Sequence, residues 1–507
     1  MRDTDDPGIQ TTDIDATTAD PALFNADLAP IPAHHRKWGA FEIFNVWTND
    51  VQSLAGYTLA ASLFIGAGIS GWYVFAAIVL AGVIVNCLVN LSGAPSVRLG
   101  VPYAVMARMS MGVLGARFPA LVRGVVAIFW YGAQTYFAST AVALAINSAL
   151  GSPGSGEFLG MNAVSWISYV IVAVLQVALF SRGIDAITRF LNVAGPAVYA
   201  VMVVLLVVIW VRAGSDMLPA VGAIFNSDDV TGWAAVSAFV GVVGTMVAYF
   251  SAVIINFGDF SRFSRSERSM RRGNLAGLPL SLAFFTFLAL FITAGAYVVF
   301  QDGRGTPMDN PSDIVGQADS VVLSIIAAVT FLVATVGVNL VANFIPPAYD
   351  MANMAPSRIS FRLGGIITAA LGFVIGALWV AVIDDIGLPT FVDTLGAVLA
   401  PLYGVLVVDY YVIRRRRVDL RDAFTLDPAG PYYYHRGWNV KGLVAVGVAA
   451  VFAVLTVWVP ALQDLSGFAW LIGAALGGVL YFAVMAGERS RIREARGPAA
   501  EEVSRGS

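Results

Sequence analysis

Residues 129–139 read FWYGAQTYFAS and lie inside a longer apolar run, residues 119–149. Trp130 and Gln134 are four positions apart, so they share one face if this run is helical. An indole face can stack on a flat ring, and a carboxamide can both donate to and accept from such a ring. About a dozen comparable runs, each near the roughly 20 residues that cross a bilayer, predict a polytopic membrane protein that handles a small polar solute.

The composition supports this interpretation. Of 507 residues, 58% are hydrophobic and only 12% are charged, and 50 are glycine. A soluble domain could not bury that much apolar surface, whereas glycines allow membrane helices to pack closely. We therefore predict an all-α polytopic membrane protein with about 12 transmembrane helices. The expected spans are residues 41–67, 71–93, 119–149, 163–181, 190–211, 233–257, 277–300, 320–345, 363–383, 387–412, 440–460 and 466–487.

The basic residues predict how the chain crosses the membrane. If the N-terminus is cytoplasmic, 28 of the 30 Lys and Arg residues fall on the cytoplasmic side, and only Arg212 and Arg304 fall outside. Such a bias indicates a multi-pass protein of the cell's inner (plasma) membrane with both termini cytoplasmic. The basic cluster at 262–272 is interpreted as an orientation signal on a solvated loop, and binding of anionic membrane lipids is its alternative. Residues 1–38 are polar and are predicted to form a disordered tail.

Several function classes are excluded by what the chain lacks. Lys37 and Lys441 are its only lysines, and neither lies in a Gly-rich phosphate loop, so ATP binding is not expected. His34, His35 and His435 all lie outside the predicted spans, which removes a metal cluster or a hydrolase triad within the membrane. We expect no enzyme activity, no cofactor, no metal and no nucleic-acid partner, and the oligomeric state is left open.

Polar residues inside the predicted spans are few. The first span contains Asn49, Asp50 and Gln52 just ahead of Gly56, a residue that can loosen the helix. A carboxylate at such depth is costly, so Asp50 is interpreted as lining a cavity or coupling a cation. The alternative is a carboxylate near the cytoplasmic end, capped by backbone amides or paired with an arginine.

Asn339 and Asn343 lie one turn apart in the eighth span, where two carboxamides can bind the amide groups of a ring. Hydrogen bonding between helices is the competing explanation for both. Aromatic residues such as Phe250 and Trp379 are ordinarily packed in the core or against lipid.

Four segments resemble signature stretches of the nucleobase:cation symporter-1 family. They are FWYGAQTY, INFGDFSRF (residues 255–263), ATVGVNLVANFIPPAYD (334–350) and VVDYY (407–411) ahead of four arginines. The resemblance implies a LeuT-like fold with a 5+5 inverted repeat, in which the first and sixth helices are interrupted around a central cavity. It divides the chain into a tail (1–38), two five-helix repeats (39–212 and 213–412), a cytoplasmic loop (413–439), two additional helices (440–487) and a second tail (488–507).

The resemblance also implies roles for single residues. Trp130 matches the tryptophan that stacks on the substrate ring, and Gln134 and Asn343 match amides that bind it. Phe250 falls where some relatives have a second stacking tryptophan, and Gln52 is a further candidate on the first span. With Asn339, these make up the predicted substrate site.

The coupling cation departs from the pattern of sodium-dependent relatives, in which the eighth helix reads ATLST. Here the matching residues 334–338 read ATVGV, so the side chains of Gly337 and Val338 offer no oxygen to sodium. We therefore expect proton coupling, with Asp50 as the first candidate to bind the proton, because burial favours the neutral form of a carboxyl group. The positions considered for cation coupling are Thr48, Asp50, Val51, Ala334 and Gly337.

The predicted function is a secondary transporter that imports a nucleobase or a related cyclic ureide, such as hydantoin, allantoin or uracil, by alternating access. Within transport, the alternative is a carrier for another nitrogenous heterocycle or a vitamin precursor. From a different class, a membrane receptor could use the same fold without transport.

Overall fold

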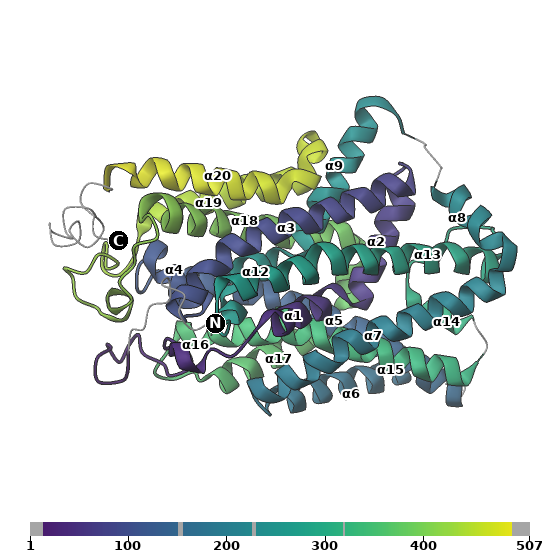
Figure 1. The fold of residues 1–507 in the computed structure, drawn as a ribbon, viewed down its shortest axis with the longest axis horizontal. Helices are drawn as coiled ribbons and strands as arrows, with labels where there is room; N and C mark the ends of the chain where they lie inside the picture. The colour runs from purple at the N-terminus through teal and green to yellow at the C-terminus, as the bar shows by residue number, and fades with distance from the viewer. Residues whose placement is uncertain (1–13, 151–155, 226–229, 318–319, 489–507) are drawn as a thin grey trace.

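A computed structural model describes residues 14–150, 156–225, 230–317 and 320–488. These residues form helices and loops with no β-strand, and most of the helices run along the long axis of the molecule (Figure 1). The first half of the chain contains α3 (Gly71–Leu99), α4 (Tyr103–Met111), α5 (Arg117–Leu150), α6 (Ala163–Phe180), α7 (Ile184–Ala213) and α8 (Met217–Phe225). The second half contains α12 (Glu267–Leu275), α13 (Ser281–Gln301), α14 (Pro311–Gly316), α15 (Val321–Val338), α16 (Ile345–Met354), α17 (Phe361–Ala377), α18 (Leu388–Val407), α19 (Val440–Trp458) and α20 (Ala469–Met485).

The first predicted span is two helices, α1 (Ala40–Val51) and α2 (Leu54–Gly66). Gln52 leaves the helical region with a ψ of 94°, and Ser53 is extended. The Ser53 hydroxyl then accepts a hydrogen bond from the Gly56 amide (2.8 Å), so it caps the start of α2. A single apolar run is thus interrupted at a residue suited to begin a new helix.

A second interruption divides the sixth predicted span. Helix α9 (Gly232–Tyr249) is followed by Phe250, which is not helical, and then by α10 (Ser251–Asn256) and α11 (Gly258–Ser261). The two interruptions meet, because the hydroxyl groups of Ser53 and Tyr249 lie 3.0 Å apart. Irregular backbone is tolerated at membrane depth only where it is covered by protein or lines a cavity.

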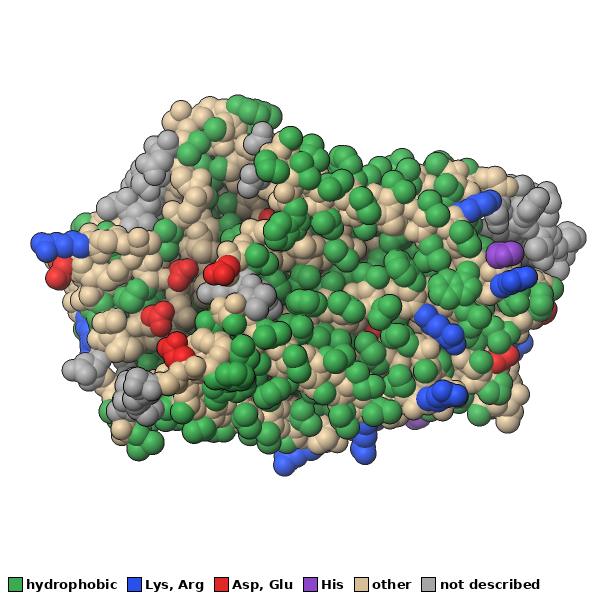
Figure 2. Space-filling view, turned by 180° about the vertical axis from the view of Figure 1, so that it is seen from behind, with side chains coloured by type: hydrophobic (Ala, Val, Ile, Leu, Met, Phe, Trp, Pro, Cys, Tyr) green, Lys and Arg blue, Asp and Glu red, His purple; other side chains and the backbone are tan. Residues whose placement is uncertain are grey.

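The described residues include nine helices long and apolar enough to cross a membrane, and α2 and α17 are shorter apolar helices. Hydrophobic side chains cover the middle of the face drawn in Figure 2, and most of its Lys and Arg side chains lie toward the right of that view. An all-α polytopic membrane protein is therefore confirmed, and the total of twelve spans stays a prediction.

The N-terminal segment differs from its prediction as a disordered tail. Its first thirteen residues lie outside the described part, but residues 14–38 pack on the end of the molecule at the left of Figure 1. Arg108 donates to the carbonyl of Leu23 (3.0 Å), and Arg262 donates to that of Ala29 (2.8 Å). Both arginine side chains are buried and need acceptors, and the main chain of this segment supplies them. The sequence had placed Arg262 on a solvated loop. That prediction is wrong for Arg262, because its side chain is buried.

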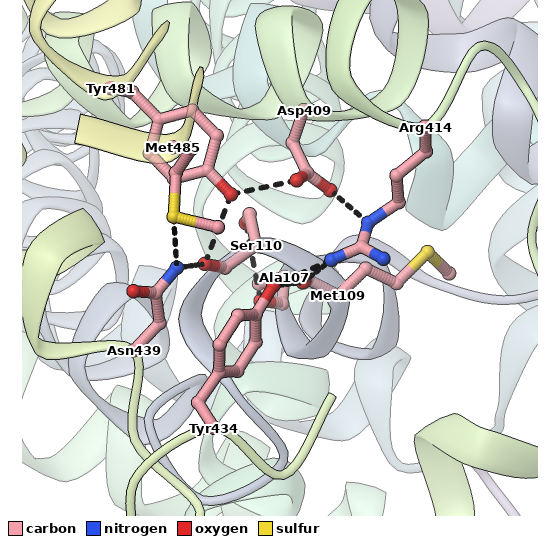
Figure 3. Close-up of polar contacts among 9 residues, drawn as sticks. All are labelled: Ala107, Met109, Ser110, Asp409, Arg414, Tyr434, Asn439, Tyr481 and Met485. Atoms are coloured by element: carbon pink, nitrogen blue, oxygen red, sulfur yellow. Dashed lines mark hydrogen bonds and ion pairs between the residues drawn. The ribbon is translucent and has the colours of Figure 1, made fainter. Parts of the chain in front are cut away.

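The last two helices are joined to the rest through a buried polar network (Figure 3). Asp409 lies in η7 (Val408–Ile413), which continues α18; its carboxylate is paired with Arg414 (2.7 Å) and accepts from the Tyr481 hydroxyl of α20 (2.7 Å). Arg414 also donates to the carbonyl of Met109 in α4 (2.6 Å). This buried ion pair therefore connects α4, α18 and α20 at one end of the molecule.

Candidate substrate-binding site

Trp130 lies in the middle of α5 and is almost fully buried. Its ring meets Tyr249 edge-on, with 5.5 Å between ring centroids, and meets Phe391 of α18 in the same way at 5.1 Å. Because Tyr249 ends α9 beside the second interruption, the predicted stacking residue is placed where the two broken helices meet. It is surrounded by aromatic rings from two other helices and does not face lipid.

Gln134 lies one turn further along α5 and is also buried. Its Oε1 accepts no hydrogen bond from the described residues, and the side chain lies close to the Tyr249 hydroxyl. Gln52, at the first interruption, has neither its Oε1 nor its Nε2 bonded. The two carboxamides predicted for the site therefore retain unused hydrogen-bonding capacity.

Asn343 lies in η4 (Asn339–Phe344), a π-helical stretch between α15 and α16. Pro346 and Pro347 bring no N–H to the start of α16, so the carbonyl of Ala342 is left for another donor. Arg123 of α5 fills that role at 2.6 Å. The irregular backbone around Asn343 is thus a consequence of the two prolines and is held by a buried arginine.

The two asparagines of η4 differ in what they can offer a solute. Asn339 donates to the carbonyl of Tyr131 (3.2 Å) and to Gln176 Oε1 (2.5 Å), and its own Oδ1 accepts from Asn343 (3.0 Å). Asn343 Oδ1 is left buried without a donor among the described residues. Asn343 therefore keeps a free acceptor. The amide group of Asn339 is used in hydrogen bonds between helices, which is the competing explanation that the sequence left open.

Phe250, a predicted site residue, and its neighbour Tyr249 make different contacts. Phe250 packs against Trp47 (6.4 Å between centroids) and Tyr249 (5.0 Å), and within the described part of the chain no ring contact joins it to Trp130. Tyr249 contacts Trp130 directly and binds Ser53. Sequence analysis missed Tyr249, although its position at the end of a broken helix was a usable signal.

Asp50 is buried near the end of α1. Among the residues that the structure describes, its carboxylate has no hydrogen bond and no ion pair, and Tyr249 is close enough to interact with it electrostatically. Neither a backbone cap nor an arginine partner, the alternatives left open by the sequence, is found for Asp50 among the described residues. An ionisable residue at such a position is costly, so Asp50 is a candidate functional residue.

The remaining cation-coupling candidates lie at the contact of α1 with α15. Thr48, Val51, Ala334 and Gly337 are all buried there or nearly so. A side chain at Gly337 would collide with Oδ1 of Asn49. Asn49 in turn donates to the carbonyls of Asn45 (2.7 Å) and Leu191 (2.9 Å). A carboxamide therefore occupies the space next to residue 337, where the sequence supplies no hydroxyl group.

Comparison with known proteins places these observations in a family. A family model described as permeases for cytosine/purines, uracil, thiamine and allantoin matches residues 30–473. The chain belongs to the nucleobase:cation symporter-1 family. This confirms the resemblance found in the sequence motifs.

Members of the nucleobase:cation symporter-1 family match nearly the whole chain. The allantoin permease of Bacillus subtilis (strain 168) is 30% identical over 91% of this chain and 93% of its own length. The purine-uracil permease of Arabidopsis thaliana is 27% identical, with 93% and 79% covered. The hydantoin permease of Microbacterium maritypicum is 27% identical, with 86% and 85% covered. The protein is therefore a transporter and not an enzyme.

The solved structure of Mhp1, a nucleobase-cation-symport-1 family transporter, in a closed conformation with bromovinylhydantoin bound, has the same fold. Its TM-score is 0.74 at 22% identity, and the match covers 92% of this chain and 95% of Mhp1. The fold shared with Mhp1 therefore confirms the LeuT-like architecture that the motifs implied.

Proposed function

We propose that this transporter imports a nucleobase or a related cyclic ureide, of the hydantoin, allantoin or uracil type, by alternating access. The proposal rests on three buried carboxamides, because Gln52, Gln134 and Asn343 each keep a polar atom without a hydrogen bond among the described residues. Gln134 lies one turn from Trp130 on α5, and Gln52 precedes Ser53, whose hydroxyl contacts the Tyr249 that packs on Trp130. Asn343 is linked through Asn339 to the main chain of α5 at Tyr131. Leaving such atoms unpaired costs about 1–3 kcal/mol each, which a ring rich in amide groups offsets when it binds. The names of the relatives, allantoin, purine-uracil and hydantoin permeases, agree with this substrate class.

In the binding mode we propose, one face of the ring stacks on Trp130. Gln134 and Asn343 bind its amide edges, and Gln52 approaches from the first interruption. Tyr249 borders the ring and links the two broken helices through Ser53. We also propose that residues 39–212 and 213–412 are inverted repeats, because each contains one interrupted helix near its start.

The end that carries residues 14–38, α4 and the 413–439 loop is proposed to face the cytoplasm. It is the end at which most basic side chains gather in Figure 2, which the positive-inside rule favours. Both chain termini would then be cytoplasmic, with the protein in the plasma membrane.

We propose the proton as the coupling cation. Sodium needs several oxygen ligands, and at residues 337 and 338 the chain supplies a glycine and a valine beside the Asn49 carboxamide. Asp50 is a buried carboxyl group without a cationic partner among the described residues. It is therefore the group proposed to bind and release the proton during transport.

A thermal-shift screen tests the substrate class. Purified protein is heated with hydantoin, allantoin, uracil, cytosine or a purine, and a ligand that binds the folded state raises the melting temperature. We expect one of these rings to stabilise wild type and to lose that effect in Trp130→Ala. Trp72, an exposed aromatic on α3, gives the matched control Trp72→Ala, which should keep the shift. Stabilisation by none of these rings contradicts the proposal, and a receptor is recognised if the ligand binds but is not accumulated by proteoliposomes.

The coupling cation is tested with the ligand so identified. Uptake into proteoliposomes should follow a pH gradient and persist when sodium is replaced by choline, and Asp50→Asn should abolish accumulation. Asp393, a buried aspartate that accepts from Thr245 (3.2 Å), provides the control Asp393→Asn. Strict dependence on sodium, or accumulation by Asp50→Asn, would show that the proton is not the coupling ion.

A further inference from the structure

A chain of hydrogen bonds leads from the main chain of α5 to the free oxygen of Asn343. It begins at the carbonyl of Tyr131, which can only accept. The hydroxyl of Thr135 donates to that carbonyl at 2.6 Å. Since its one proton is used there, the Thr135 oxygen can only accept from other groups. Two carboxamides approach it, Gln176 Nε2 at 3.1 Å and Asn339 Nδ2 at 3.2 Å.

This first step fixes the orientation of both carboxamides. Because Gln176 turns its NH₂ group toward Thr135, its Oε1 faces Asn339 and accepts from Asn339 Nδ2 at 2.5 Å. Asn339 likewise has its NH₂ group committed, so only its Oδ1 faces Asn343. That oxygen accepts from Asn343 Nδ2 at 3.0 Å. The last group in the chain, Asn343 Oδ1, is buried and unbonded among the described residues.

We propose that Gln176 and Thr135 are positioning residues that hold Asn343 with its oxygen toward the substrate. Neither is assigned a contact with substrate: Gln176 lies on α6, and its bonds go to α5 and η4. This inference rests on the proposed substrate class and deepens it. At Asn343 the site offers only an acceptor, so the transported ring must present an N–H group there.

The alternative orientation of Asn343 is disfavoured by the same chain. Rotating its carboxamide by half a turn would place Oδ1 against Asn339 Oδ1, so that two acceptors would face each other and one hydrogen bond would be lost. Once Asn339 is no longer held, this preference weakens, and Asn343 can accommodate ring groups that lack an N–H. A hydrogen bond of this kind corresponds to roughly a three- to tenfold change in affinity.

The test compares ligands that differ in one N–H group. Dissociation constants of hydantoin, 1-methylhydantoin and 3-methylhydantoin are measured by calorimetry on the purified full-length protein. Wild type should bind hydantoin more tightly than at least one methyl derivative. In Gln176→Met the affinity for hydantoin should fall roughly three- to tenfold, and the ratio between hydantoin and that derivative should shrink by a similar factor. In its neutral form the carboxyl group of Gln176→Glu can donate to Thr135 and accept from Asn339, so this variant should keep the wild-type ratio.

Two further variants separate positioning from general damage to the fold. Tyr169→Phe removes a bond of the same helix, from the Tyr169 hydroxyl to the carbonyl of Phe373 (2.7 Å), that does not lead to Asn343, and it should leave the ratio unchanged. Thr135→Val removes the hydroxyl that orients both carboxamides and should reduce the ratio as Gln176→Met does. Thr135→Val therefore tests the positioning role even if Gln176→Met does not fold.

The outcomes distinguish this inference from the function on which it rests. If wild type binds hydantoin and both Gln176→Met and Thr135→Val keep its affinity and ratio, the positioning role is overturned and the proposed function stands. If hydantoin, allantoin and the nucleobases all fail to bind wild type, the proposed function is overturned and the positioning role falls with it.

Discussion

Gly337→Ala should destabilise the protein far more than an added methyl group ordinarily does. The new side chain would collide with Asn49 Oδ1, so the Asn49 carboxamide must move. It would then lose its buried bonds to the carbonyls of Asn45 (2.7 Å) and Leu191 (2.9 Å). Two bonds at about 1 kcal/mol each, with buried groups left unpaired, give a loss of about 2–4 kcal/mol in the free energy of unfolding.

A double-mutant cycle measures whether this collision is the cause. Asn49→Ala removes the carboxamide and should itself be destabilising. In Asn49→Ala/Gly337→Ala the added methyl group has room, so the double variant should melt close to Asn49→Ala. The two effects should therefore be strongly less than additive.

Thermal unfolding in detergent, followed by tryptophan fluorescence, gives the four melting temperatures that the cycle needs. Gly447→Ala is the control, because a side chain at Gly447 in α19 meets open space and alanine favours a helix. A melting temperature for Gly337→Ala within a degree of wild type, or additive effects in the cycle, would show that Asn49 does not fill the space beside residue 337.

Three other changes probe different parts of the molecule. Arg414→Met leaves the buried carboxylate of Asp409 unpaired and should cost about 3–5 kcal/mol of stability, seen as a large fall in melting temperature; an unchanged value would mean that the pair of Figure 3 does not anchor α20. Tyr249→Phe removes the bond to Ser53 and should weaken ligand binding by roughly three- to tenfold without unfolding the protein, whereas unaltered affinity would separate Tyr249 from the site. Arg108→Gln combined with Arg262→Gln removes the arginine bonds to the main chain of the N-terminal segment and should speed its cleavage by protease, and equal cleavage rates would mean that these arginines do not hold residues 14–38.

The positions of the helices were predictable because long apolar runs leave a membrane chain few alternatives. The interruption near Gln52 was implied by the family resemblance, and Ser53 and Gly56 mark it in the sequence. Within the site, Trp130 and Gln134 could be paired because their spacing in one helix is local information. On η4, however, the sequence did not show which of two asparagines, Asn339 or Asn343, keeps an unpaired atom for the substrate.

That choice depended on contacts between distant parts of the chain. Asn339 and Gln176 are 163 residues apart in sequence, so nothing local indicates that Asn339 is bonded to α6 and Asn343 is not. The contact between Tyr249 and Trp130 could not be predicted for the same reason, because it joins α9 to α5, which are far apart in the sequence. Composition alone also misjudged the N-terminal segment, whose main chain is held by arginines from elsewhere in the chain.

An experimental structure with the ring ligand found by the thermal-shift screen tests the binding site most directly. We expect the ring to lie against the indole of Trp130, with an N–H within hydrogen-bond distance of Asn343 Oδ1 and a second amide group bound to Gln134. A ligand located away from Trp130, or a ring that turns an acceptor toward an Asn343 with its NH₂ group outward, would contradict this description of how the protein recognises its substrate.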